Sequence, residues 1–142
     1  MKRKRSYMVG SILIICILSG CVSYNAKKLE YYSQKENYIL TTGTLESIQY
    51  SDEFAALYFE FSEITPSYDD ICFKIVGPNV QIVKQNGLDT KLRPGDKVTF
   101  VSAPRYFGDG YVFPIVALSA KESNFLDYEE GLSNFLDWLR LQ

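Results

Sequence analysis

The chain has 142 residues, 46% of them hydrophobic and 23% charged, which are values of a globular protein of about one domain. Four of its 15 basic residues lie at positions 2–5, so the other 11, with 17 acidic residues, leave residues 21–142 with a net charge of −6. That balance lacks the basic surface that binds nucleic acid, and we expect no nucleic-acid partner. Histidine is absent, which excludes Ser–His and Cys–His catalysis and removes the commonest zinc ligand, and we expect neither a metal ion nor another cofactor.

The first 20 residues have the organisation of an export signal. Residues 2–5 are all basic, and residues 8–18 form an apolar stretch of eleven residues, which is short for a membrane span of about 20 residues. The stretch ends in the tetrapeptide Leu18-Ser19-Gly20-Cys21.

This tetrapeptide resembles the lipobox of bacterial lipoproteins, with a leucine three residues before the cysteine and small residues between them. The resemblance implies cleavage by signal peptidase II between Gly20 and Cys21, and a diacylglyceryl anchor on the Cys21 thiol. We therefore expect a lipid-anchored protein on the extracytoplasmic face of the cell membrane; an outer-membrane address is allowed because Val22 is not the aspartate of an inner-membrane retention signal. The alternatives are an uncleaved signal anchor, or an ordinary signal peptide followed by an incidental cysteine.

The chain divides into three parts on this basis. Residues 1–20 are the signal peptide, residues 21–37 form a polar, tyrosine-rich lipidated tether with a short helix over residues 26–36, and residues 38–142 form the domain. We expect the tether to hold the domain off the bilayer.

Five strands are predicted in the domain from alternating and β-branched segments bounded by turn residues. They cover residues 38–50, 54–64, 71–77, 97–103 and 111–120. Gly43 inside the first strand predicts a bulge or a bend, and Pro114 inside the fifth favours an edge position.

Two helices are predicted in addition. Asn79 and Gly87 are suited to begin and end a short helix between the third and fourth strands. A C-terminal helix over residues 127–141 has Asp127 and Glu130 at capping-box spacing, followed by an apolar stripe at positions 132, 135, 136 and 139. We expect the stripe to pack on one end of the strands; the alternative is a helix that binds a partner or a membrane. The sequence Ser-Asn-Phe-Leu-Asp occurs at residues 123–127 and again at 133–137, which we interpret as accidental.

The order of three strands, a short helix and two strands resembles the OB-fold, a small five-stranded barrel. The segment from Leu92 to Phe100, Leu-Arg-Pro-Gly-Asp-Lys-Val-Thr-Phe, and the glycine in a long first strand are similar to features of such barrels. The predicted fold is therefore mainly β, an OB-like barrel with a C-terminal amphipathic helix. A different small barrel or a half-open sheet is the alternative.

Four aromatic residues around the last loop are the candidate binding surface: Tyr106, Phe107, Tyr111 and Phe113. Tyrosine offers a rigid, amphipathic contact area for proteins or sugars. The alternative is that these rings pack the loop and the core.

Other chemistry-bearing residues are fewer. Cys72 lies in a predicted strand and reads as a small buried residue, because a reactive thiol needs an electropositive, accessible setting. The acidic residues of the second strand and its flanking loops read as solvated side chains, although two carboxylates can hydrolyse glycosides; the candidates for such a pair are Glu60, Glu63, Asp69 and Asp70. Asp52 and Glu53 extend this acidic group, but no calcium-loop pattern is present.

The leading hypothesis is a membrane-anchored, non-enzymatic interaction module whose partners are the membrane, through Cys21, and another protein of the cell envelope. The first alternative is a lipoprotein that binds a solute or a cell-wall glycan. The second is an envelope hydrolase that uses paired carboxylates.

Overall fold

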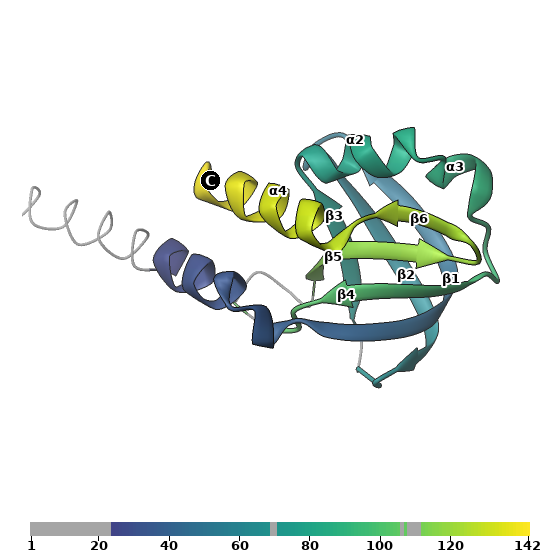
Figure 1. Cartoon of the computed structure of the whole chain (residues 1–142), viewed down its shortest axis with the longest axis horizontal. Coiled ribbons are helices and arrows are strands. Elements are labelled where there is room, and N and C mark those ends of the chain that lie inside the picture. Colours follow the sequence, from purple (N-terminus) through teal and green to yellow (C-terminus); the bar gives the residue numbers. More distant parts are fainter. Residues whose placement is uncertain (1–23, 69–70, 106, 108–111) are drawn as a thin grey trace, which may run out of the picture.

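The protein is described by a computed structural model, which places residues 24–68, 71–105, 107 and 112–142. The predicted signal peptide and Leu18, Ser19, Gly20 and Cys21 lie outside the described residues. The chain is mainly β, as predicted. In the described part, the elements are a 3-10 turn η1 (Lys35–Asn37), strands β1 (Ile39–Ser51), β2 (Ala56–Thr65), β3 (Cys72–Val76), β4 (Lys97–Ser102), β5 (Val112–Ala120) and β6 (Ser123–Leu126), and helices α2 (Pro78–Gln85), α3 (Leu88–Lys91) and α4 (Tyr128–Arg140) (Figure 1).

Residues 24–33 are also helical, and we call them the N-terminal helix. They fall in the segment predicted to be a tether, where the sequence indicated a helix over residues 26–36. None of the helices among the described residues combines the length and the apolar character needed to cross a membrane.

The six strands form one sheet in the order β3-β2-β1-β4-β5-β6. Neighbours in this order are antiparallel, and β3 pairs in addition with β5 in a parallel register, Phe73 opposite Phe113. The helices α2 and α3 connect β3 to β4 and lie over one side of the sheet (Figure 1).

The predicted irregularity at Gly43 is present. The register between β1 and β2 shifts between Thr42 and Thr44, and a second shift follows between Leu45 and Ser47. A side chain at Gly43 would place its Cβ 3.1 Å from the Cβ of Phe61, so glycine lets the two strands approach closely here. On the facing strand, Glu63 takes a positive φ of 50°, which a non-glycine residue adopts mostly at a bulge or turn.

The position of β5 corrects one prediction. Pro114 was expected on an edge strand, but β5 pairs with three strands, β3, β4 and β6. The register between β4 and β5 shifts next to the proline, between Val101 and Ser102. An irregular ladder tolerates the missing N–H, and the Ser102 hydroxyl donates a hydrogen bond of 2.7 Å to the Pro114 carbonyl. The sixth strand, β6, was not predicted; it covers the first four residues of the first copy of the repeated sequence, whose fifth residue, Asp127, caps α4.

The main core lies between the sheet and the two short helices, and aromatic rings dominate it. Phe73 is fully buried, and its ring centroid lies 4.7 Å from that of Phe100, which in turn stacks at 4.6 Å on Phe61. Val83 and Leu88, from α2 and α3, complete this cluster without measurable exposure.

The short helix α2 begins at Pro78, one residue before the predicted cap. Its N-cap is Gly77, and Asn79 makes no capping bond but is buried. The Asn79 amide donates a hydrogen bond of 2.8 Å to the carbonyl of Gly131 and accepts one of 3.1 Å from Asn134. A residue predicted to cap its own helix therefore joins α2 to α4. Gly87 follows α2 in the left-handed region, as its predicted role as a helix end requires.

The C-terminal helix forms and packs as its pattern predicts. Asp127 caps it by accepting bonds from the backbone of Glu129 and Glu130. Leu132 and Phe135 are buried in a second cluster, to which the N-terminal helix contributes Tyr32 with only 5% exposure. The first and last helices thus lie side by side at one end of the sheet (Figure 1).

Candidate functional site

Of the four aromatic residues that were proposed as one binding surface, the structure describes Phe107 and Phe113, and these two lie in different clusters. Tyr106 and Tyr111 lie outside the described residues. Phe113 is only 4% exposed, on β5, and packs against Phe73 in the main core. Phe107 is half-buried and belongs to the second cluster. The structure does not bring these two phenylalanines together, and Phe113 offers almost no surface to a ligand.

Phe107 instead receives the N-terminal helix. Its ring centroid lies 5.5 Å from those of Tyr31 and Tyr32, and the Tyr24 hydroxyl donates to its carbonyl. The guanidinium of Arg105 lies 4.9 Å from the centroids of both Phe107 and Tyr31, a cation–π geometry. These contacts give Phe107 a packing role, the alternative that the sequence had left open.

The candidate acids also have identifiable partners. Glu60 accepts a hydrogen bond of 2.8 Å from Ser47 and Glu63 one of 3.1 Å from Thr44, each across the β1–β2 pair. Asp69 and Asp70 lie outside the described residues. Among the described residues, no three acids or cysteines gather closely enough to hold a metal ion.

Cys72 begins β3 and is half-buried. Burial raises the pKa of its thiol, the carboxylate of Glu60 adds to that effect, and the thiol lies 3.6 Å and 3.7 Å from the carbonyls of Phe59 and Phe73. A raised pKa keeps the thiol protonated at neutral pH, and the thiolate is the reactive form.

We therefore expect Cys72 to react slowly with iodoacetamide. At pH 7 its alkylation in the folded chain should be on the order of ten-fold slower than in urea-unfolded chain. The rate should rise with pH along a curve whose midpoint lies above that of the unfolded chain, because the thiol pKa is raised. Peptide mapping by mass spectrometry at successive times gives both rates. Equal rates in the two states would contradict the assignment.

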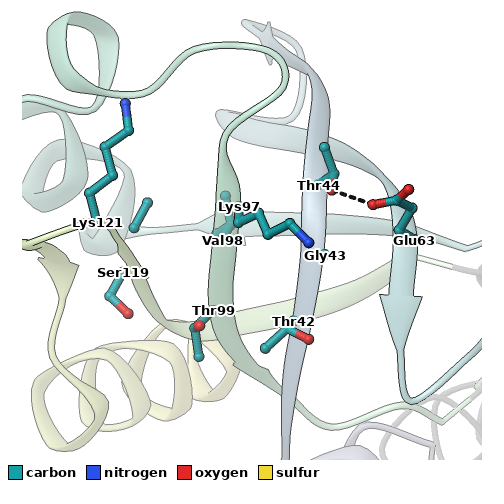
Figure 2. A pocket seen from close by; sticks show the side chains of 10 residues that line it. Thr42, Gly43, Thr44, Glu63, Lys97, Val98, Thr99, Ser119 and Lys121 are labelled. Carbon is teal, nitrogen blue, oxygen red and sulfur yellow. Dashed lines mark hydrogen bonds between the residues drawn. The ribbon is translucent and has the colours of Figure 1, made fainter.

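A hollow with a volume of about 340 Å³ lies on the outward side of β1, β4 and β5 (Figure 2). Short side chains make it. Thr42 lies opposite Thr99, and Thr99 opposite Ser119, so one hydroxyl from each strand forms a row across the sheet. Alternation explains the outward position of Thr99, because its neighbours along β4, Val98 and Phe100, are buried on the opposite side of the sheet.

Charged side chains lie along one side of this row (Figure 2). Lys97 extends from β4 over β1, and it forms no ion pair within the described part of the chain (Figure 2). Lys121 pairs with Asp96 at 3.0 Å. The backbone N–H of Arg93 and the Lys121 ammonium lower the pKa of the Asp96 carboxyl, so this acid stays ionised and holds the turn before β4. Glu63 closes the far side of the hollow.

Apolar side chains continue the same surface on the other side of the row. A second hollow of about 220 Å³ shares Thr99 and Ser119 with the first and extends to Leu40, Val101 and Ala117. Leu40 is 64% exposed, an unusual value for a leucine in a central strand. We call this surface the outer face; it comprises Leu40, Thr42, Thr44, Lys97, Thr99, Val101, Ala117, Ser119 and Lys121.

The alternation of residues along β1 and β4 indicates the outer face in the sequence, but the aromatic residues near the last loop were the more prominent candidates. Thr42, Thr44, Lys97 and Thr99 occupy outward positions of β1 and β4. The inward positions beside them are Thr41, Gly43 and Leu45 on β1 and Val98 and Phe100 on β4. Which strands lie side by side was not readable, so residues about 55 positions apart could not be joined into one row. Comparison with protein-family models, with curated proteins and with solved structures finds no match to this chain.

Proposed function

We propose that this protein is a lipoprotein of the cell envelope, anchored through Cys21 on the extracytoplasmic face of the membrane. Support comes from the ordered features of the first 21 residues: a basic segment, a short apolar stretch and the sequence Leu18-Ser19-Gly20-Cys21. Two acyl chains on Cys21 suffice for stable attachment, whereas one chain binds marginally.

The anchoring has a direct test. Cys21→Ala should accumulate as an unprocessed precursor that keeps residues 1–20, and Ser19→Ala, which changes another small residue of the same segment, should be processed normally. The mass of the protein extracted from membranes distinguishes the two forms. A Cys21→Ala protein that is cut and released like the wild type would remove the basis of this proposal.

The finer fold that we propose is the OB-like barrel. The β3–β5 pairing supports it, since it joins strands that are separated by β2, β1 and β4 in the sheet order. The placement of α2 and α3 between β3 and β4 supports it too. β6 and α4 would then be additions after the fifth strand.

The role that we propose for the domain is non-enzymatic binding of another envelope protein through the outer face. The supporting observation is the composition of that face: an exposed leucine, a row of hydroxyls and a lysine without an ion-pair partner in the described chain, on strands that are fixed by pairing on both sides. Apolar area with a few polar groups, held on a rigid scaffold, is the usual make-up of a protein contact.

A photo-crosslinking amino acid placed at Thr99 in living cells tests this role. We expect one defined crosslinked envelope protein from position 99, and its loss when Leu40→Glu is added. The matched control places the same crosslinker at Gln81, an exposed position on α2. The same product from both positions, or a product from 99 that survives Leu40→Glu, would contradict docking on the outer face.

A second candidate is the binding of a polar solute or glycan in the hollow beside Lys97. Its volume falls at the lower limit of small-ligand sites, and its hydroxyls and ammonium group suit an oxygen-rich ligand. A thermal shift with cell-wall saccharides that is lost in Thr99→Val would favour this candidate over protein docking.

A further inference from the structure

The N-terminal helix begins very close in sequence to the proposed anchor. Three residue steps separate Cys21 from Tyr24, and three steps of extended chain span at most about 11 Å. The first turn of this helix therefore lies within about that distance of a lipid on Cys21.

The N-terminal helix is packed onto the domain. Tyr32 is 5% exposed, and its ring centroid lies 5.1 Å from that of Phe135 on α4. Just after the helix, Lys35 pairs with Glu129 at 2.9 Å. Because the helix is packed on the domain, it fixes which end of the domain lies near the anchor. The bilayer therefore faces that end.

The C-terminus of α4 lies on the same side of the domain as the start of the N-terminal helix (Figure 1). Asn25 and Gln142 line the same groove, together with Trp138 and Leu139. The neighbouring Leu141 is 84% exposed, the highest value among the large hydrophobic residues described, and Tyr24 is 38% exposed. Tryptophan and tyrosine are enriched where proteins meet the membrane interface.

Among the described residues that line the hollows at this end, the charged ones are mostly basic, although the domain as a whole is acidic. Two hollows flank the N-terminal helix, and their linings contain four basic residues and a single acid, Glu30; the basic residues are Lys27, Lys28, Lys74 and Arg105. Residues 21–142 carry a net charge of −6, so this local excess is not a consequence of composition. Basic groups near a bilayer surface are attracted by anionic headgroups.

We propose that this end of the domain, which we call the anchor-side surface, lies on the bilayer and binds anionic phospholipid headgroups. It comprises Tyr24, Lys27, Lys28, Arg105, Trp138 and Leu141. The proposal rests on lipidation of Cys21 and replaces the expected tether, which would hold the domain off the bilayer, by a helix packed on the domain. It adds an orientation: the anchor-side surface contacts lipid, while β1, β4 and β5 present the outer face to a partner.

Trp138 reports on this contact directly, because it is the only tryptophan in the chain. The lipidated protein, purified from membranes, is reconstituted into vesicles of phosphatidylcholine or of equal parts phosphatidylcholine and phosphatidylglycerol, with lipids brominated near the headgroup. We expect strong quenching of Trp138 in the anionic vesicles, and weaker quenching in phosphatidylcholine or at high salt, which screens exposed charges.

Charge reversal supplies the matched comparison. Lys27→Glu with Lys28→Glu should weaken the contact with anionic vesicles by about 25-fold or more and lower the quenching accordingly, since each of the two lost basic residues contributes about a five-fold factor. Lys84→Glu with Lys91→Glu, the same charge change on α2 and α3, should leave quenching unchanged. Unaltered urea midpoints establish that both double variants fold.

The failures of the two proposals are distinguishable. A protein whose mass lacks the diacylglyceryl group contradicts the proposed anchoring before any vesicle is used. A lipidated protein whose Trp138 is not quenched, or is quenched equally with and without phosphatidylglycerol, overturns the anchor-side surface and leaves the anchoring intact.

Discussion

Gly131→Ala is expected to destabilise the fold by about 3 kcal/mol or more, the upper range for overpacking a core. Gly131 lies where α4 crosses β5, and a Cβ there would be placed 2.0 Å from the carbonyl oxygen of Val116 and 2.9 Å from Cγ of Leu126. The nearest obstacle is backbone, which cannot turn away as a side chain can. The helix must therefore move off the sheet, and the bond from Asn79 to the Gly131 carbonyl is strained or lost.

Urea denaturation of Gly131→Ala measures this effect. Ser133→Ala is the control, because Ser133 is exposed two residues along the same helix and alanine favours helix more than serine does. The control should leave the free energy of unfolding within about 0.5 kcal/mol of the wild type. A Gly131→Ala protein as stable as the control would show that α4 does not pack as closely on β5 as described.

Phe73→Ala is expected to cost about 3–5 kcal/mol, the usual range for deleting a buried phenylalanine ring. Phe73 has no measurable exposure, and its ring lies within 6.1 Å of those of Phe61, Phe100 and Phe113. Its backbone also pairs with β5. Domains are typically stable by only 5–15 kcal/mol, so the loss is a large share of the total.

Denaturant unfolding again gives the free energy, and hydrogen exchange locates the damage. Phe54→Ala, at a ring that is 62% exposed after β1, is the matched control and should change stability little. We expect faster exchange in β3 and β5 for Phe73→Ala alone. Similar losses in the two variants would mean that the aromatic cluster does not dominate the core.

The elements that the sequence predicted well are those set by local patterns. Alternation at Val98 and Phe100 predicted β4, and Asp127 with the stripe through Leu132 and Phe135 predicted α4 and its buried side. The hydrophobic period and the capping residues of an element depend on residues close in sequence. They can therefore be recognised without knowledge of the tertiary structure.

The candidate site was predicted less well because it depends on which strands pair. Phe107 and Phe113 are close in sequence, yet one packs against the N-terminal helix and the other against Phe73. Conversely, Thr42, Thr99 and Ser119 are far apart in sequence and adjacent across the sheet. Burying the aromatic rings in the two clusters removes their apolar area from water. This burial favours the observed arrangement over one in which the rings form an exposed surface.

By itself the sequence predicted the mainly β class and the amphipathic C-terminal helix, and it carries the pattern ending at Cys21 on which the proposed lipidation rests, because each is encoded in contiguous stretches. Only the tertiary structure decided that Asn79 joins two helices, that Pro114 lies in a strand paired on both sides, and that Gly131 must lack a side chain. Those roles depend on atoms brought close from distant positions. Hydrogen bonds and close packing join residues that are near in space, and the local propensity of a segment does not indicate which distant residue it will contact.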